Sequence, residues 1–194
     1  MDHLALLGFA IAMSVAPGPN VLMVAAGAAN AGVRATVPHM LGIAIGFGAM
    51  LLIVGIGLAA PFAAAPWLHT VLEWGGAAWL LLLAWKIARA GAPGEGPARP
   101  PLGFVGAALF QWVNPKAWMI ALAAIPAFTA PDGDMLAQSL VIAGAFALVA
   151  FPCTLVWALL GAGASRLLRT GRALRGFNIA MAVLLVASLV PAFV

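Results

Sequence analysis

Residues 4–29 read LALLGFAIAMSVAPGPNVLMVAAGAA, an apolar run that is interrupted beyond its midpoint by two prolines. A helix needs about 20 apolar residues to cross the hydrocarbon core of a bilayer. Pro17 and Pro19 each remove a backbone donor, and Gly18 permits conformations that are closed to other residues. Carbonyls one turn earlier then lose their partners, which a membrane tolerates only where protein or water replaces them. Pro17-Gly18-Pro19, with Asn20 directly after it, predicts a broken membrane helix.

The remainder of the chain is equally apolar. Of 194 residues, 65% are hydrophobic and only 7% are charged, against roughly 25% charged in soluble domains. We expect an all-α membrane protein that forms one transmembrane domain over residues 1–194. Six segments reach the length that a membrane helix needs: residues 4–29, 38–60, 68–88, 104–127, 135–161 and 173–193.

A second break falls in the fourth segment. Gln111 precedes Asn114-Pro115-Lys116 there, and Pro115 interrupts the helical hydrogen bonds. An ionisable residue at this depth costs at least ~2.5 kcal/mol on insertion scales, so Lys116 marks a functional site by default. The alternative interpretations are a lysine that extends to the interface and prolines that only kink their helices. We favour function for both motifs because several unusual residues coincide in each.

The two breaks lie half a chain apart. Pro17 and Pro115 are separated by 98 positions, and shifting the second and third segments by that amount places them approximately on the fifth and sixth. Three helices per half is an odd number, so the second half would enter the membrane upside down. The spacing predicts two inverted three-helix repeats, about residues 1–96 and 97–194, in which the first and fourth helices are broken.

Charge placement predicts the orientation. Both termini and the second and fourth connections hold no Lys or Arg. Cytoplasmic loops are enriched in these residues, so we expect both termini on the periplasmic side. Eight positive residues lie in or beside the first, third and fifth connections: Arg34, Lys86, Arg89, Arg99, Arg166, Arg169, Arg172 and Arg175.

Several other functions are disfavoured. The nine Lys and Arg residues are scattered between apolar runs, so nucleic acid is not an expected partner. Cys153 is the single cysteine and is expected to be a buried hydrophobe. We expect no catalytic residues, no cofactor and no metal ligands, because no nucleophile with its base and no ligand cluster occurs at depth. An ion or metal transporter remains the alternative function, although it would usually show several inward-facing carboxylates, thiols or histidines.

The two motifs resemble a known family. Pro17-Gly18-Pro19-Asn20, together with Asn114-Pro115-Lys116-Ala117, resembles the LysE/RhtB family of amino-acid exporters, and Gly75 to Leu80 followed by Ala84-Trp85-Lys86 is similar to that family's third helix. The resemblance implies a bacterial inner-membrane protein that moves amino acids outward, with both motifs in the translocation path. Trp79 departs from the tyrosine frequent in the family, and His39 from a smaller or apolar residue.

We hypothesise that the two breaks face each other across a central cavity and bind a small amino acid. Exposed donors at the broken helix ends, with Lys116, would favour its carboxylate. The ammonium of the amino acid would bind to carbonyls that the prolines free and to the side chains of Asn20 and Gln111. Glu73 is the only carboxylate within an apolar segment, which favours a small neutral amino acid or derivative over lysine or arginine.

The energy source is less defined by the sequence. The chain has no ATP-binding motif, and proton antiport is what the resemblance implies. Lys116, Glu73 and His39 are the candidate coupling residues, although we expect His39 to be an interfacial residue at the start of the second helix. Facilitated efflux down a gradient stays open, and so does assembly into a homo-oligomer.

Overall fold

The computed structural model is helical in all its regular elements. It describes residues 2–58, 66–90, 101–130, 132–167 and 170–190. The elements are α1 (His3–Val15), α2 (Pro19–Ala31), α3 (Val33–Ile53), the π-helical turn η1 (Val54–Leu58), α5 (Pro66–Ala88), α6 (Phe104–Phe110), the 3-10 turn η2 (Gln111–Val113), α7 (Pro115–Phe128), α8 (Met135–Leu167) and α9 (Gly171–Ala187).

Both predicted breaks are confirmed. The first expected helix consists of α1 and α2, whose axes differ by 53°. Asp2 caps the start of α1 by accepting from the backbone N–H groups of Leu4 and Ala5, and Pro19 occupies the first turn of α2. The fourth expected helix consists of α6, η2 and α7, and Pro115 opens α7. Proline is favoured at such a start because the N–H that it lacks would have no helical acceptor there.

Several helix boundaries differ from the predicted ones, among them the start of α3, the end of α8 and the end of α9, which lies at Ala187 rather than at residue 193. Helix α3 begins at Val33 rather than at Pro38, because Gly32 (φ 86°) reverses the chain in a single residue. A positive φ is accessible to glycine without steric cost. Pro38 therefore lies inside α3, where it removes one hydrogen bond near the helix start. Helix α8 extends past the predicted residue 161 to Leu167.

Length and apolar composition identify two described helices that can cross a membrane, Val33–Gly57 and Met135–Leu167, and the bent pair α1–α2 provides a third. Large hydrophobic side chains also point outward, among them Leu4 (81% exposed) and Leu148 (78% exposed). An apolar outer surface of this extent fits lipid rather than water. The chain is therefore a membrane protein whose described elements are all helical, while the arrangement with six spans stays a prediction.

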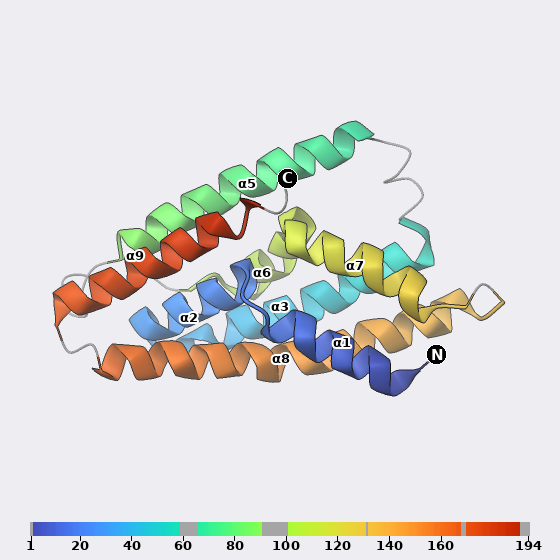
Figure 1. Cartoon of the computed structure of the whole chain (residues 1–194), viewed down its shortest axis with the longest axis horizontal. Coiled ribbons are helices and arrows are strands. Elements are labelled where there is room, and N and C mark those ends of the chain that lie inside the picture. The colour runs from blue at the N-terminus through green and yellow to red at the C-terminus, as the bar shows by residue number, and fades with distance from the viewer. Residues whose placement is uncertain (1, 59–65, 91–100, 131, 168–169, 191–194) are drawn as a thin grey trace.

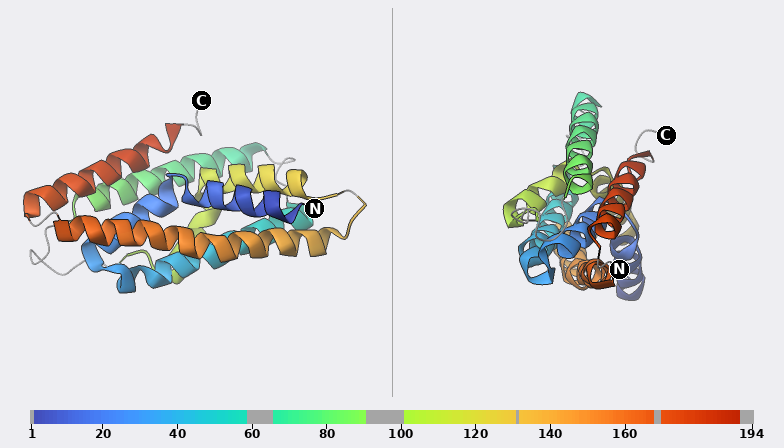
Figure 2. Two further views of the ribbon diagram at one scale, coloured as in Figure 1. Left: turned by 60° about the horizontal axis from the view of Figure 1, so that its bottom comes forward. Right: turned by 90° about the vertical axis from the view of Figure 1, so that its left-hand side faces the viewer.

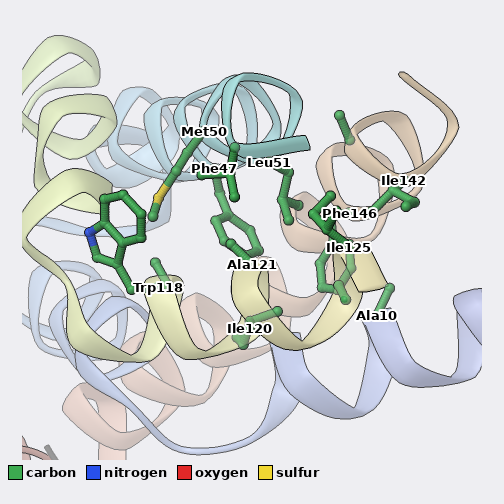
Figure 3. Close-up of a cluster of buried hydrophobic side chains, with 14 of the residues drawn as sticks. Ala10, Phe47, Met50, Leu51, Trp118, Ile120, Ala121, Ile125, Ile142 and Phe146 are labelled. Atoms are coloured by element: carbon green, nitrogen blue, oxygen red, sulfur yellow. The ribbon is translucent and has the colours of Figure 1, made fainter. Parts of the chain in front are cut away.

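The longest helix organises the molecule. Helix α8 runs along α1, α2 and α3, while α5 and α9 lie side by side on the opposite side (Figures 1 and 2). The largest apolar cluster joins α1, α3, α7 and α8 (Figure 3). At its centre the ring of Phe146 meets those of Phe47 and Phe9 edge-on, with centroids 5.3 and 6.1 Å away. This cluster fixes α7, and with it the second break, against α1 and α3.

Small residues allow the helices to approach closely. Gly161 of α8 lies against the backbone of Ala25 in α2, and Gly42 and Gly46 of α3 lie against the backbone of α6 at Phe104 and Ala108. Helices in lipid associate largely through such close contacts, because burial of apolar surface offers little driving force there.

Replacing Gly161 by valine is expected to lower the yield of folded, monodisperse protein several-fold, because a side chain there would overlap the Ala25 carbonyl. Gly163→Val is the matched control, since it lies in the same helix and a Cβ there would meet nothing within 4 Å. Size-exclusion chromatography of the detergent-solubilised variants measures both. Equal yields for the two variants would contradict the close contact between α2 and α8.

Candidate functional site

The two breaks meet in the interior, and Lys116 connects them. This lysine lies in the first turn of α7, and its Nζ donates to the carbonyl of Ala16 at 2.7 Å and to that of Pro17 at 3.4 Å. Both carbonyls belong to the break between α1 and α2. They follow the last residue of α1, and the final carbonyls of a helix have no donor within it. A cation from the second break therefore satisfies the backbone that the first break exposes.

Local chain chemistry positions Lys116. Asn114 is the N-cap of α7, and its side-chain oxygen accepts from the backbone N–H of Lys116 at 3.2 Å. Asn is among the best N-caps because its short side chain reaches the free N–H groups of the first turn. Gly18 gives the lysine its space, because a Cβ there would lie 2.8 Å from Lys116 Cδ. The φ of Gly18 is 176°, an extended conformation, so the requirement for glycine is steric contact rather than backbone strain.

A reciprocal amide pair joins the breaks on a second side. Asn20 Nδ2 donates to Gln111 Oε1 at 2.9 Å, and Gln111 Nε2 donates back to Asn20 Oδ1 at 3.1 Å. Gln111 is fully buried and also donates to the Ala107 carbonyl at 2.9 Å. Buried amides are costly unless they are paired, so each of these side chains stabilises the other. The residues lie 91 positions apart and come from opposite halves of the chain.

A small cavity lies between the breaks. Its volume is about 40 Å³, and Asn20, Gln111, Asn114 and Lys116 provide most of its polar wall. The rest of the wall is largely apolar, with Met13, Ile43, Phe47 and Ile120 among its residues. A buried water needs roughly 10–15 Å³ of such volume, so the cavity has room for a few waters.

Sequence reasoning missed two polar residues of this cavity, Ser14 and Thr154. Ser14 lies in the last turn of α1, three positions before Pro17, and that proximity to the break was an available signal. Thr154 comes from α8 and is 2% exposed. Its hydroxyl donates to carbonyls of its own helix, at Ala150 (2.8 Å) and Phe151 (2.9 Å).

Of the two other candidate coupling residues, His39 is not part of the described wall of this cavity. His39 lies in the second turn of α3 and is 1% exposed, so the expectation of an interfacial side chain is wrong. The early start of α3 explains the difference, because it brings His39 into the packed part of the helix. Glu73 belongs to α5, and its side chain lies outside the described residues. Among the described residues, no three His, Cys, Asp or Glu side chains gather as a metal site would require.

Gly18→Ala is expected to displace the Lys116 side chain and, on the export function that the sequence predicts, to slow transport several-fold while the protein still folds. The extended backbone accepts alanine, but the new methyl group would lie within 3.2 Å of Nζ and nearer still to Cδ. The matched control is Gly8→Ala in α1, where a Cβ meets nothing within 4 Å. Initial rates of substrate efflux from proteoliposomes measure the effect, and equal rates for the two variants would exclude tight contact at Gly18.

Two helices are broken inside the protein, and a lysine and an amide pair lie at the breaks. These features define a class of membrane protein whose polar site lies at broken helices, as in many secondary transporters. The chain belongs to the LysE type translocator family, whose sequence model matches residues 11–188.

Its relatives include the cysteine/O-acetylserine efflux proteins of Escherichia coli strain K12 and of Shigella sonnei strain Ss046. Each is 30% identical over 187 residues, which cover 95% of this chain and 94% of the relative. No solved structure matches the chain.

Proposed function

We propose that the chain is a secondary transporter that exports small amino acids or their derivatives, neutral ones in preference, across the bacterial inner membrane. One observation carries the proposal: the Lys116 ammonium lies where the two broken helices meet, and both its acceptors are neutral backbone carbonyls. A cation held in this way can exchange those carbonyls for a carboxylate, which binds it more strongly. The efflux function of the relatives supports the same cargo.

The site can take both charged groups of an amino acid. Its carboxylate would pair with Lys116, and the carbonyls of Ala16 and Pro17 that the lysine releases would accept from its ammonium. The amide pair of Asn20 and Gln111 offers further donors and acceptors. No carboxylate belongs to the described wall of the cavity, which favours a neutral side chain over a cationic one.

Transport on this proposal requires the helices to move. A cavity of about 40 Å³ is much smaller than the roughly 300 Å³ at which small-molecule sites begin. The described conformation therefore represents a closed site that is satisfied internally. The breaks are the natural hinges, because the backbone there lacks regular helical hydrogen bonds.

Helix contacts support the proposal of two inverted repeats. Helices α3 and α8, the second of each half, pack against each other, and so do α5 and α9, the third of each half. Helix α8 contacts both parts of the broken helix α1–α2, as α3 contacts α6 and α7. A two-fold relation between the halves produces this pattern, because it makes each contact recur with the repeats exchanged.

Both termini are proposed to face the periplasm. Alkaline phosphatase fused after residue 194 is then expected to be active, and a fluorescent protein that folds only in the cytoplasm is expected to be dark when fused there. The reverse pattern would contradict this orientation. Fusions at residue 134, in the fourth connection, should give the same periplasmic pattern and provide an internal control.

Efflux from proteoliposomes tests the function. Purified protein is reconstituted with labelled O-acetylserine, cysteine, lysine or a divalent cation inside, and release is followed with and without a pH gradient. We expect release of the neutral compounds well above that of lysine. Release of the cation alone would favour the ion or metal transporter instead. Acceleration by an opposing proton gradient would support proton antiport, and release that ignores the gradient would support facilitated efflux.

A further inference from the structure

A second and much larger cavity lies at the end of the molecule where α2 is followed by α3 and where α5 ends. Its volume is about 540 Å³, and its wall comes from α2, α3, α5 and the residues just before α6. This volume falls within the range of roughly 300–1,000 Å³ that small-molecule sites occupy. We call it the α2–α5 cavity. None of its described wall residues belongs to the small cavity between the breaks.

His39 stands out in its wall. The side chain is 1% exposed, and neither ring nitrogen has a hydrogen-bond partner among the described residues. Both ring nitrogens are covered in the described conformation, so a ligand in the cavity accepts from them only after the ring turns toward it. A buried donor without a partner costs roughly 1–3 kcal/mol, and such a contact removes that cost. An imidazole N–H is a suitable donor to a carboxylate.

Positive charge in and beside the wall also suits a carboxylate. Lys86 of α5 contributes a cation, whereas Asn30 of α2 already donates to Asn178 at 2.8 Å and to the Ala26 carbonyl at 2.7 Å. The described wall contains no Asp or Glu. The guanidinium of Arg89 lies 4.6 Å from the ring centroid of Trp85, which adds a second positive charge next to the wall. The cavity is therefore electrostatically suited to anions.

Helix α2 connects this cavity to the small one. Asn20, Met23, Gly27 and Asn30 follow the spacing i, i+3, i+7 and i+10, which places them on one face of the helix. Asn20 lines the small cavity, and the other three line the α2–α5 cavity. At 1.5 Å per residue, Asn20 and Asn30 lie roughly 15 Å apart along the axis. Along α2 from Asn20, Met23 is the first residue in the wall of the large cavity. Its flexible side chain can move aside for a substrate.

We propose that the α2–α5 cavity is a second binding site for the small amino acid, an access vestibule in which His39 and Lys86 hold the carboxylate before the substrate passes along α2 to Lys116. This inference rests on the proposed export function and deepens it. The proposed orientation places the vestibule on the cytoplasmic side, where substrate for export arrives.

Transport kinetics provide the first test. Inside-out membrane vesicles expose the cytoplasmic side, so uptake of labelled O-acetylserine follows the export direction. His39→Leu and Lys86→Met are each expected to raise KM about tenfold and to leave the maximal rate within twofold of the wild type. Arg175→Met, an exposed positive residue, is the control and should change neither quantity. A role in packing alone would instead lower the amount of active protein, and thus the maximal rate.

Thiol protection provides a test that does not depend on transport. Ala26 lines the vestibule and is 2% exposed, so Ala26→Cys in a Cys153→Ala background places a single small thiol in its wall. O-acetylserine is expected to slow the modification of this thiol by a small maleimide. O-acetylserine methyl ester, which lacks the carboxylate, should not slow it. Ser165→Cys is the control, because this residue belongs to α8 and is not in the described wall of the vestibule. It should react equally with and without substrate.

The outcomes separate the two proposals. Wild-type vesicles that take up no O-acetylserine would contradict the export function for this compound. Wild-type uptake together with unchanged KM in both variants and no protection of the thiol introduced by Ala26→Cys would overturn the vestibule alone. Protection by the ester as strongly as by O-acetylserine would overturn the role of His39 and Lys86 in holding a carboxylate.

Discussion

Replacing Lys116 by methionine is expected to reduce the initial rate of O-acetylserine efflux roughly 10- to 100-fold. The variant removes the charge that would hold the carboxylate and the hydrogen bonds to Ala16 and Pro17. Hydrogen bonds to charged groups contribute about 1.5–3 kcal/mol, and each ~1.4 kcal/mol of lost transition-state stabilisation is a factor of ten in rate. Efflux from proteoliposomes with equal amounts of reconstituted protein measures the loss.

The choice of methionine separates charge from packing. Its unbranched side chain can still lie over Gly18, where the lysine stem lies now. We therefore expect the folded yield to stay close to that of the wild type. Arg172→Met removes an exposed positive charge outside the site and should transport normally. Lys116→Arg keeps the charge but brings a larger, planar group against Gly18, so an intermediate rate is expected. Efflux by Lys116→Met at the wild-type rate would contradict the proposed binding of the substrate carboxylate by Lys116.

The broken helices were predictable because proline acts locally. Pro17, Pro19 and Pro115 cannot continue a helix that runs into them, and the glycine or asparagine beside each marks the break. A proline alone is not enough, since Pro38 lies inside α3. The partners across the breaks were not predictable in the same way. Lys116 meets the carbonyl of Ala16 across 100 positions, and such a contact depends on how α7 packs against α1 and α3. The sequence led to the hypothesis that the two breaks face each other. It did not predict that Lys116 itself would donate to the carbonyls of the first break.

The error at His39 and the omission of Thr154 from the site have one physical origin. Sequence position indicated their approximate depth, but which side of a helix faces inward depends on packing in an all-apolar chain. In a soluble helix the polar side reveals the outer face, whereas here both faces are apolar and that signal is lost. His39 was therefore assigned to an interface, although it lies in the wall of a cavity. Thr154 likewise showed no sign that α8 contributes to the central site.

The paired amides yield the second large effect. Gln111→Leu is expected to lower the rate of efflux at least about tenfold and to destabilise the protein by roughly 1–3 kcal/mol, the cost of leaving a buried amide without its partner. The side chain left behind is that of Asn20, which forms both of its reciprocal bonds with Gln111. Thermal unfolding in detergent and efflux from proteoliposomes measure the two effects on the same preparation. Gln138→Leu, which removes an amide bonded to Ala130 away from the cavity, should leave efflux unchanged.

The double variant Asn20→Leu/Gln111→Leu distinguishes a structural pair from a site that handles substrate. Removing both partners leaves no unpaired amide, so a large part of the lost stability should return. Efflux should nevertheless stay low, because the cavity between the breaks would have lost two of its four main polar side chains. Recovery of both stability and efflux would mean that the amides only join the two halves of the chain. Recovery of stability alone would assign them to the path of the substrate, beside the lysine that bridges the same two breaks.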